Sequence, residues 1–324
     1  MKISLALVGA AIAGAAAAAS VNMTASGSVM RSVKLDKLAS ERTSSETPTK
    51  NLPIDWHLLS QAGGLAQEPY CMLQPVGLQV GDSVLLWKSE NANNQSRVSV
   101  FKSDSLGIVL SIQGTDVGSL NGYLHDIDFG RTDPDATFDG ILPAGVKLDH
   151  GFQKGYLDIE EMSIAAVKKY MKEYGAKQVT ITGHSLGAAI AVLFGVKLES
   201  LLGKGSVKYV LGFGLPRLGN QVFADYVDET LGGRLYYAVN GDDIVARLPP
   251  RAFGYQHPSG QIWISPANSD QWVYCPGQEN THCSLSVIPN PIPLLNHVGT
   301  YFHTIVGWGP LPCPPKVGDV SNIP

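Results

Sequence analysis

Residues 183–187 have the sequence Gly-His-Ser-Leu-Gly, and this stretch decides the fold. The short segment 178–182 before it is rich in β-branched residues, which predicts a strand. The segment 188–198 after it is apolar, which predicts a buried helix. G-x-S-x-G between a strand and a helix is typical of a nucleophile elbow, a strained turn that lifts a serine hydroxyl above the sheet edge. The alternative is a Gly-rich turn with an ordinary exposed serine, but the strand and helix on either side favour the elbow.

Further segments extend this strand and helix into a layered fold. Residues 106–112, 234–239 and 261–264 are predicted strands, and residues 159–174 are a predicted helix. Together with the elbow they predict an α/β-hydrolase fold, with a mostly parallel central sheet and helices on both faces.

A serine hydroxyl is a weak nucleophile near neutral pH, so Ser185 needs a base and an acid that orients the base. In this fold class the expected chain order is serine, acid, histidine. The predicted strand at 234–239 leads into Asp242 and Asp243, at the strand end where open α/β sheets place their chemistry. Position favours Asp243, although Asp242 remains open and both also suit an ordinary turn.

Four histidines follow these aspartates: His257, His282, His297 and His303. His282 lies between two cysteines in a predicted surface loop, and His257 suits a structural or turn position. His297 follows a proline-rich loop at 289–293, which can bring an imidazole over the sheet edge. His297 is therefore the favoured base and His303 the second candidate.

The oxyanion formed during ester hydrolysis needs two hydrogen-bond donors. One is the backbone N–H after the nucleophile, which belongs to Leu186. The other is predicted in the loop after the strand at 106–112, where Thr115 offers both an N–H and a hydroxyl. A plain strand-ending turn is the alternative for Thr115.

These motifs together resemble the fungal class 3 lipases, to which feruloyl esterases of the same fold are close kin. The matching segments are residues 183–187, 214–220, 243–250 and 296–302, within a similarity that spans about residues 70–313. The resemblance implies Ser185 as nucleophile, Asp243 as acid and His297 as base, and it places the oxyanion donors on Thr115 and Leu186. The sequence has no His-x-x-x-His pair and no Cys-x-x-Cys with ligand spacing, and the triad chemistry is self-contained, so no metal or organic cofactor is expected.

Three positions depart from the pattern of the family. Gln113 stands where many members have arginine, Ala246 where many have proline, and Asn296 where aspartate usually precedes the catalytic histidine. None of the three departures removes a catalytic group.

Four cysteines allow three pairings, and free thiols are a further alternative. The resemblance implies the disulfides Cys71–Cys313 and Cys275–Cys283. Asn94 begins an Asn-x-Ser sequon in a polar loop, so it is a glycosylation candidate.

The first 19 residues have the charged start, apolar run and small-residue end of a signal peptide. Residues 20–52 predict a propeptide or disordered leader, and residues 53–324 the hydrolase domain. We therefore expect a secreted, extracellular protein. No second apolar run suggests a transmembrane anchor, and the net charge of −4 gives no indication of nucleic-acid binding.

The segment most relevant to the choice of substrate follows Thr115. Residues 119–126 predict a short helix with Leu120, Tyr123 and Leu124 on one face, in the position of the lipase lid. The resemblance implies that Asp126 supports the oxyanion hydroxyl. The acidic stretch at 128–139 is unusual for such a lid and keeps a feruloyl-type esterase, or a loop with no gating role, in view.

The sequence thus predicts a secreted serine carboxylic-ester hydrolase, with a triacylglycerol lipase that forms an acyl-enzyme on Ser185 as the first hypothesis. Its partner would be a lipid or small ester, with an oil–water interface as one setting. The second hypothesis is a feruloyl-type esterase acting on soluble esters. The third is a non-catalytic binding protein on the same fold, which the intact set of catalytic residues disfavours.

Overall fold

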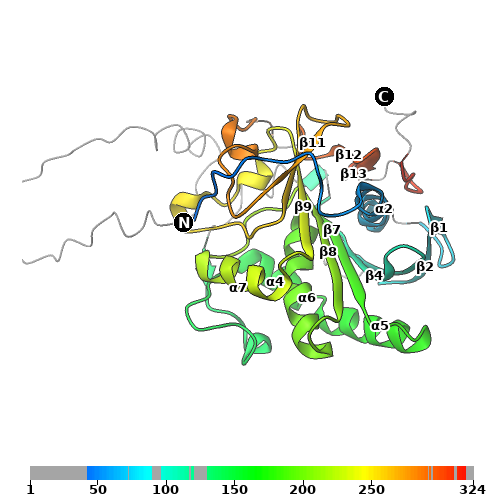
Figure 1. The fold of residues 1–324 in the computed structure, drawn as a ribbon. Helices are drawn as coiled ribbons and strands as arrows, with labels where there is room; N and C mark the ends of the chain where they lie inside the picture. The colour runs from blue at the N-terminus through cyan, green and yellow to red at the C-terminus, as the bar shows by residue number, and fades with distance from the viewer. Residues whose placement is uncertain are drawn as a thin grey trace, which may run out of the picture.

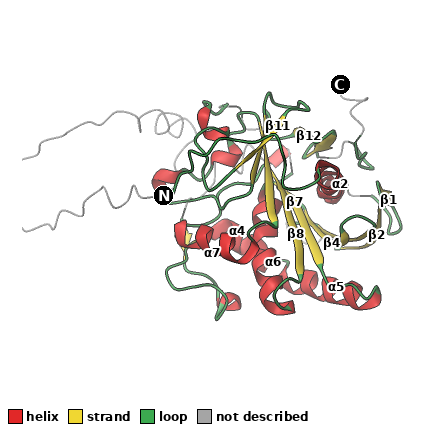
Figure 2. Ribbon diagram, in the orientation of Figure 1, coloured by secondary structure: helices red, strands yellow, loops and turns green. Residues whose placement is uncertain are grey.

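The computed structural model describes residues 42–71, 73–89, 96–116, 118–119, 130–290, 292, 295–309 and 312–318. Over these residues the main feature is a nine-stranded sheet (Figures 1 and 2). In spatial order its strands are β1 (Gln79–Val80), β2 (Ser83–Lys88), β3 (Val98–Ser103), β4 (Gly107–Ile112), β7 (Val179–His184), β8 (Val207–Phe213), β9 (Leu235–Asn240), β10 (Gln261–Ile264) and β11 (Trp272–Cys275).

Smaller elements surround this sheet. Two hairpin-like pairs are β5 (Arg131–Thr132) with β6 (Leu148–Asp149), and β12 (Gly299–Tyr301) with β13 (Thr304–Val306). The α-helices are α2 (Trp56–Gln67), α4 (His150–Leu157), α5 (Glu160–Glu173), α6 (Leu186–Leu202) and α7 (Gln221–Leu231). The 3₁₀ turns are η3 (Glu68–Tyr70), η4 (Ala136–Phe138), η5 (Val245–Arg247), η6 (Arg251–Phe253) and η7 (Ser284–Ser286).

The five central strands, β4, β7, β8, β9 and β10, run parallel, and antiparallel strands extend the sheet on both sides. Parallel strands are covered on both faces, so their residues are largely buried along the whole length of the strand. In β7 every residue is buried, as in β9. All five parallel strands end at the same edge of the sheet, which is where the predicted site residues follow them.

Helices cover both faces of the sheet, as the sequence predicts. One apolar core lies between the sheet and α4, α5, α6 and α7, and a second lies between the sheet and α2 with the β12–β13 pair. Figure 1 shows α4, α6 and α7 on one side of the central strands and α2 on the other. The predicted α/β-hydrolase fold is confirmed.

The described part of the predicted leader, from residue 42 onward, lies against the domain. The Ser44 N–H donates to the carbonyl of Gln278, and Thr49 pairs with Tyr274 at the edge strand β11. These residues are thus packed onto the folded unit. The predicted signal peptide and residues 20–41 of the leader lie outside the described residues. In the described segments, no helix combines the length and apolarity needed to cross a membrane.

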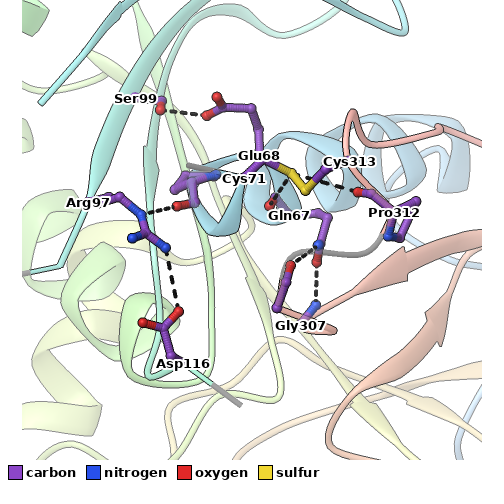
Figure 3. Close-up of a disulfide and its surroundings, with 11 residues drawn as sticks. Gln67, Glu68, Cys71, Arg97, Ser99, Asp116, Gly307, Pro312 and Cys313 are labelled. Atoms are coloured by element: carbon purple, nitrogen blue, oxygen red, sulfur yellow. Dashed lines mark hydrogen bonds and ion pairs between the residues drawn. A yellow bond between two sulfur atoms is a disulfide. The ribbon is translucent and has the colours of Figure 1, made fainter. Parts of the chain in front are cut away.

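Both disulfides implied by the resemblance are present. Cys71–Cys313 joins residues 242 positions apart, and Cys275–Cys283 closes a loop of 8 positions. The first of them links the end of η3 to the chain that follows β13 (Figure 3). It therefore ties the first helix of the domain to its last segment.

Candidate active site

Ser185 lies between the end of β7 and the start of α6, in the turn that the sequence predicts. Its backbone has φ 58° and ψ −127°, a region that non-glycine residues rarely occupy and that is often found at functional sites. A Cβ on Gly183 would lie 2.4 Å from the Gly187 carbonyl oxygen, and one on Gly187 would lie 2.2 Å from that of Ile112. Only glycine fits at either position, so both glycines allow the tight turn that places Ser185 at the sheet edge, where the residue is 2% exposed.

His297 and Asp243 form a fully buried pair. The His297 Nδ1 lies 2.9 Å from Asp243 Oδ2, and both side chains are 0% exposed. Asp243 follows β9, and its Oδ1 accepts a hydrogen bond of 2.8 Å from the Val245 N–H, which fixes the carboxylate. Because the carboxylate accepts from Nδ1, the proton of the neutral ring lies there and Nε2 is an acceptor. That Nε2 is buried with no hydrogen-bond partner among the described residues.

Gly214 explains part of the motif at 214–220. Its φ is +59°, and a Cβ there would lie 2.7 Å from Cε1 of His297. A side chain at this position would therefore displace the imidazole ring. The glycine lets the backbone after β8 lie directly against the base.

The competing candidates lie elsewhere. The Asp242 carboxylate accepts from the Asn296 side chain, and His303 lies in the β12–β13 turn beside Trp56 at a ring distance of 5.2 Å. His257 is buried and donates from Nε2 to a backbone carbonyl, and burial lowers the pKa of its imidazole to about 4. The contact with Asp242 also explains why Asn296 departs from the family pattern, because an aspartate at this position would face the carboxylate of Asp242.

The loop after β4 lies against the elbow. A Cβ on Gly114 would come within 2.3 Å of the His184 carbonyl oxygen and 3.0 Å of the Ser185 Cβ. The neighbouring Thr115 hydroxyl is buried and has no partner in the part of the chain that the structure describes. Leu186 begins α6, so its N–H belongs to the first turn, which has no intrahelical acceptor. The loop that carries Thr115 thus lies directly beside the elbow.

Gln113, where many family members have arginine, forms a small hydrogen-bond network with Arg97 and Asp116. The Gln113 Nε2 donates to Asp116 at 2.7 Å, and its Oε1 accepts from the Arg97 N–H at 3.1 Å. The guanidinium of Arg97 then lies 3.5 Å from the same Asp116 carboxylate (Figure 3). Gln113 and Arg97 together hold the loop that carries Thr115.

A buried ion pair contacts the segment that follows Asp243. Arg217 contacts Glu279 through two bonds of 2.6 and 2.9 Å, and their side chains are 3% and 2% exposed. Arg217 also donates to the carbonyls of Arg247 and Pro249, in the segment that follows Asp243. Burial would raise the pKa of Glu279, but the charge and hydrogen bonds of Arg217 outweigh it and hold that pKa at about 2. From the sequence, Arg217 stands out only as part of the motif at 214–220 and Glu279 not at all, because nothing local links residues 62 positions apart.

We predict that Glu279→Gln weakens the fold and flattens its acid dependence. The carboxyl titrates at about 2 when folded against an ordinary value of 4.5, so its contribution is present above pH 4.5 and is lost as the pH falls towards 2. Removing the charge leaves Arg217 unpaired, at a cost of about 3–5 kcal/mol at pH 7. Urea unfolding at pH 7, 5 and 3 measures both effects. The surface variant Asp158→Asn, which breaks an exposed pair with Lys154, is the control with little change. An unaltered pH slope in Glu279→Gln would contradict the assignment.

Several predicted positions cannot be placed. Leu120, Tyr123, Leu124 and Asp126 of the predicted lid, and the glycosylation candidate Asn94, lie outside the described residues. Their assignments stay predictions. Within the described segments, no group of three or more His, Cys, Asp or Glu side chains is arranged to hold a metal ion.

The fold and the site together define a serine hydrolase of the α/β-hydrolase class. The profile of the family "Lipase (class 3)" matches residues 109–253. The chain is 45% identical over 276 residues to the secreted mono- and diacylglycerol lipase LIP4 of Malassezia restricta, covering 85% of this chain and 91% of that one. It is also 45% identical to the secreted mono- and diacylglycerol lipase MDL2 of Malassezia globosa, covering 83% and 88%.

Solved structures agree with this assignment. A lipase from Rhizopus microsporus var. chinensis superposes with a TM-score of 0.68 at 27% identity, covering 82% of this chain and 93% of that one. The Lip2 lipase of Yarrowia lipolytica gives a TM-score of 0.70 at 25% identity, covering 82% and 98%. A triacylglycerol lipase whose catalytic centre is described as a serine protease triad gives 0.66 at 27%, covering 78% and 95%. The chain belongs to the class 3 lipase family, and it is a secreted carboxylic-ester hydrolase.

Proposed function

We propose that the protein hydrolyses mono- and diacylglycerols through an acyl-enzyme on Ser185, with His297 as base and Asp243 as the acid that orients it. The observation that supports this most is the fully buried His297–Asp243 pair at the edge of the sheet where the elbow presents Ser185. The sequence alone put triacylglycerols first. The names of the relatives at 45% identity favour the partial glycerides instead.

The proposed reaction has two halves. In the first, Ser185 attacks the ester carbonyl while its proton passes to Nε2 of His297, which is the free acceptor on that ring. The tetrahedral oxyanion is held by the Leu186 N–H and by Thr115, and the glycerol alkoxide leaves with the proton from His297. In the second, water takes the place of the alcohol and the same groups release the fatty acid. Asp243 stays ionised and stabilises the imidazolium.

We predict that Thr115→Val lowers kcat roughly 10²–10³-fold with KM little changed, because the hydroxyl binds charge that develops only in the transition state. The isosteric side chain keeps the shape and the backbone N–H. Thr115→Ser retains the hydroxyl and should keep most of the activity, so it is the matched control. Steady-state rates on p-nitrophenyl butyrate measure the effect. An increase of KM alone would mean that the hydroxyl contacts only the bound substrate.

The substrate proposal is tested by initial rates on emulsified monoolein, diolein and triolein, with methyl ferulate as a soluble aromatic ester. We expect turnover of monoolein and diolein to exceed that of triolein by at least about tenfold. Equal or faster triolein hydrolysis would restore the triacylglycerol lipase, and a preference for methyl ferulate would support the feruloyl-type esterase. No hydrolysis of any ester would favour the non-catalytic binding protein.

A further inference from the structure

The side chain of Tyr70 lies behind the proposed catalytic groups without being one of them. Tyr70 ends η3 and is only 2% exposed. Its hydroxyl oxygen lies 3.1 Å from the Gly114 nitrogen and 2.9 Å from Nδ1 of His184. Burial raises the pKa of Tyr70 far above its ordinary value, so the hydroxyl keeps its proton at every working pH. The hydroxyl therefore accepts one hydrogen bond and has one to give.

The direction of each bond is fixed by His184, which precedes Ser185 in the elbow. Its Nε2 lies 2.8 Å from the carbonyl oxygen of His297, and a carbonyl can only accept, so Nε2 carries the proton. Nδ1 is then an acceptor, and Tyr70 donates to it. Burial, with a smaller effect of the neighbouring His297, lowers the pKa of His184 well below its ordinary value. The ring stays neutral and the order of donors does not change.

One continuous chain results: the Gly114 N–H donates to Tyr70, Tyr70 to His184, and His184 to the His297 carbonyl. One end of the chain is the loop 113–116, called the oxyanion loop, and the other end is the backbone of His297, the proposed base. Gly307 leaves room for the His184 ring in the middle of this chain, because a Cβ there would lie 2.4 Å from Cε1 of His184.

Tyr70 itself is held from both sides. Cys71 is bonded to Cys313, and the Arg97 Nε donates to the carbonyl of Pro69 at 2.6 Å (Figure 3). Arg97 also reaches Asp116 at the far end of the oxyanion loop. The backbone around Tyr70 is thus fixed independently of the hydroxyl, and removing that hydroxyl leaves the ring in place.

We propose that the Tyr70 hydroxyl is a positioning group for ester hydrolysis, which sets the oxyanion loop, the elbow and the base relative to one another through this chain. The inference rests on the proposed function, since it needs a reaction at Ser185. Tyr70 acts through Gly114 and His184, and its effect belongs to the transition state because the loop and the base must both be in place only there.

The test is Tyr70→Phe, assayed with p-nitrophenyl butyrate. We expect kcat to fall about 10- to 10²-fold, less than for loss of a direct oxyanion donor, with KM within about twofold. The matched control is Tyr170→Phe in α5, whose hydroxyl donates to the Leu86 carbonyl at 3.0 Å. Tyr70→Phe loses two buried hydrogen bonds, and Tyr170→Phe loses the bond to Leu86 and a longer contact of 3.4 Å with Lys169. The melting temperature should fall by about 2–4 °C for each lost buried bond, while only Tyr70→Phe loses kcat.

A second variant guards against a folding defect. His184→Asn breaks the same chain at its middle, and the double variant should be no slower than the slower single one, because both changes interrupt one path. Unchanged kcat in Tyr70→Phe, a rise in KM alone, or an equal loss of kcat in Tyr170→Phe would overturn the proposal. Those outcomes leave the dependence on Ser185 intact, whereas turnover that survives loss of Ser185 would overturn the proposed function itself.

Discussion

Replacing Ser185 with alanine is expected to lower kcat about 10⁶-fold, because no other group can form the acyl-enzyme. The side chain loses one oxygen, and the turn between β7 and α6 keeps its shape. Single-turnover release of p-nitrophenol from p-nitrophenyl butyrate measures the loss. The wild-type protein should show a burst equal to the enzyme concentration where deacylation is slow, and the variant should show none.

Contaminating esterase is the main source of error at such low rates. A p-nitrophenyl alkylphosphonate titrates the wild-type nucleophile to completion, and mass spectrometry should find the adduct on the peptide that contains Ser185. Residual turnover that resists the phosphonate, or an adduct on another serine, would show that the nucleophile has been misassigned.

Asp243→Asn is expected to lower kcat about 10⁴-fold with little change in stability of the turn. The Val245 N–H must still donate to the side-chain oxygen, so the new NH₂ group faces Nδ1 of His297. That arrangement forces the ring proton onto Nε2, and His297 can then no longer accept the proton of Ser185. The loss is a change of tautomer in an otherwise unchanged site.

The adjacent aspartate provides the control. Asp242→Asn alters only the contact with Asn296, and its kcat should remain within a few-fold of the wild type. Rates of both variants on the same soluble ester decide between the two positions. Comparable losses in the two variants would mean that the whole turn, and not the carboxylate of Asp243, governs the activity.

Much of the fold follows from local pattern. The strand before Ser185, the helix after it and the strand ends at Ile112 and Asn240 are visible because β-branched and apolar runs are interrupted by glycine and polar residues. Those interruptions also mark the catalytic edge, so Asp243 and Thr115 could be proposed from position and motif.

The remaining parts of the site depend on pairs that are distant in sequence. The sequence around Tyr70 does not predict a hydrogen bond to His184, which is 114 positions away, and the sequence around Glu279 does not predict its contact with Arg217. The choice between Asp242 and Asp243 turns on a shift of one residue within a turn, which periodicity does not resolve. Such groups are found only once the chain is folded, because tertiary packing selects them.

The contact between α2 and β13, with the Cys71–Cys313 link beside it, also has a consequence for biosynthesis. Cys71 and Cys313 are 242 positions apart, so the disulfide and the contact of α2 with β13 can form only when the ribosome has made almost the whole chain, whereas α2 can pack on β4, β7 and β8 earlier. At 5–20 residues per second that delay is roughly 12–50 s. During this interval the face of α2 that contacts β13 stays uncovered and is open to chaperones. Truncations that end before β13 should accordingly bind chaperones persistently, while chains that extend past Cys313 should be released and oxidised.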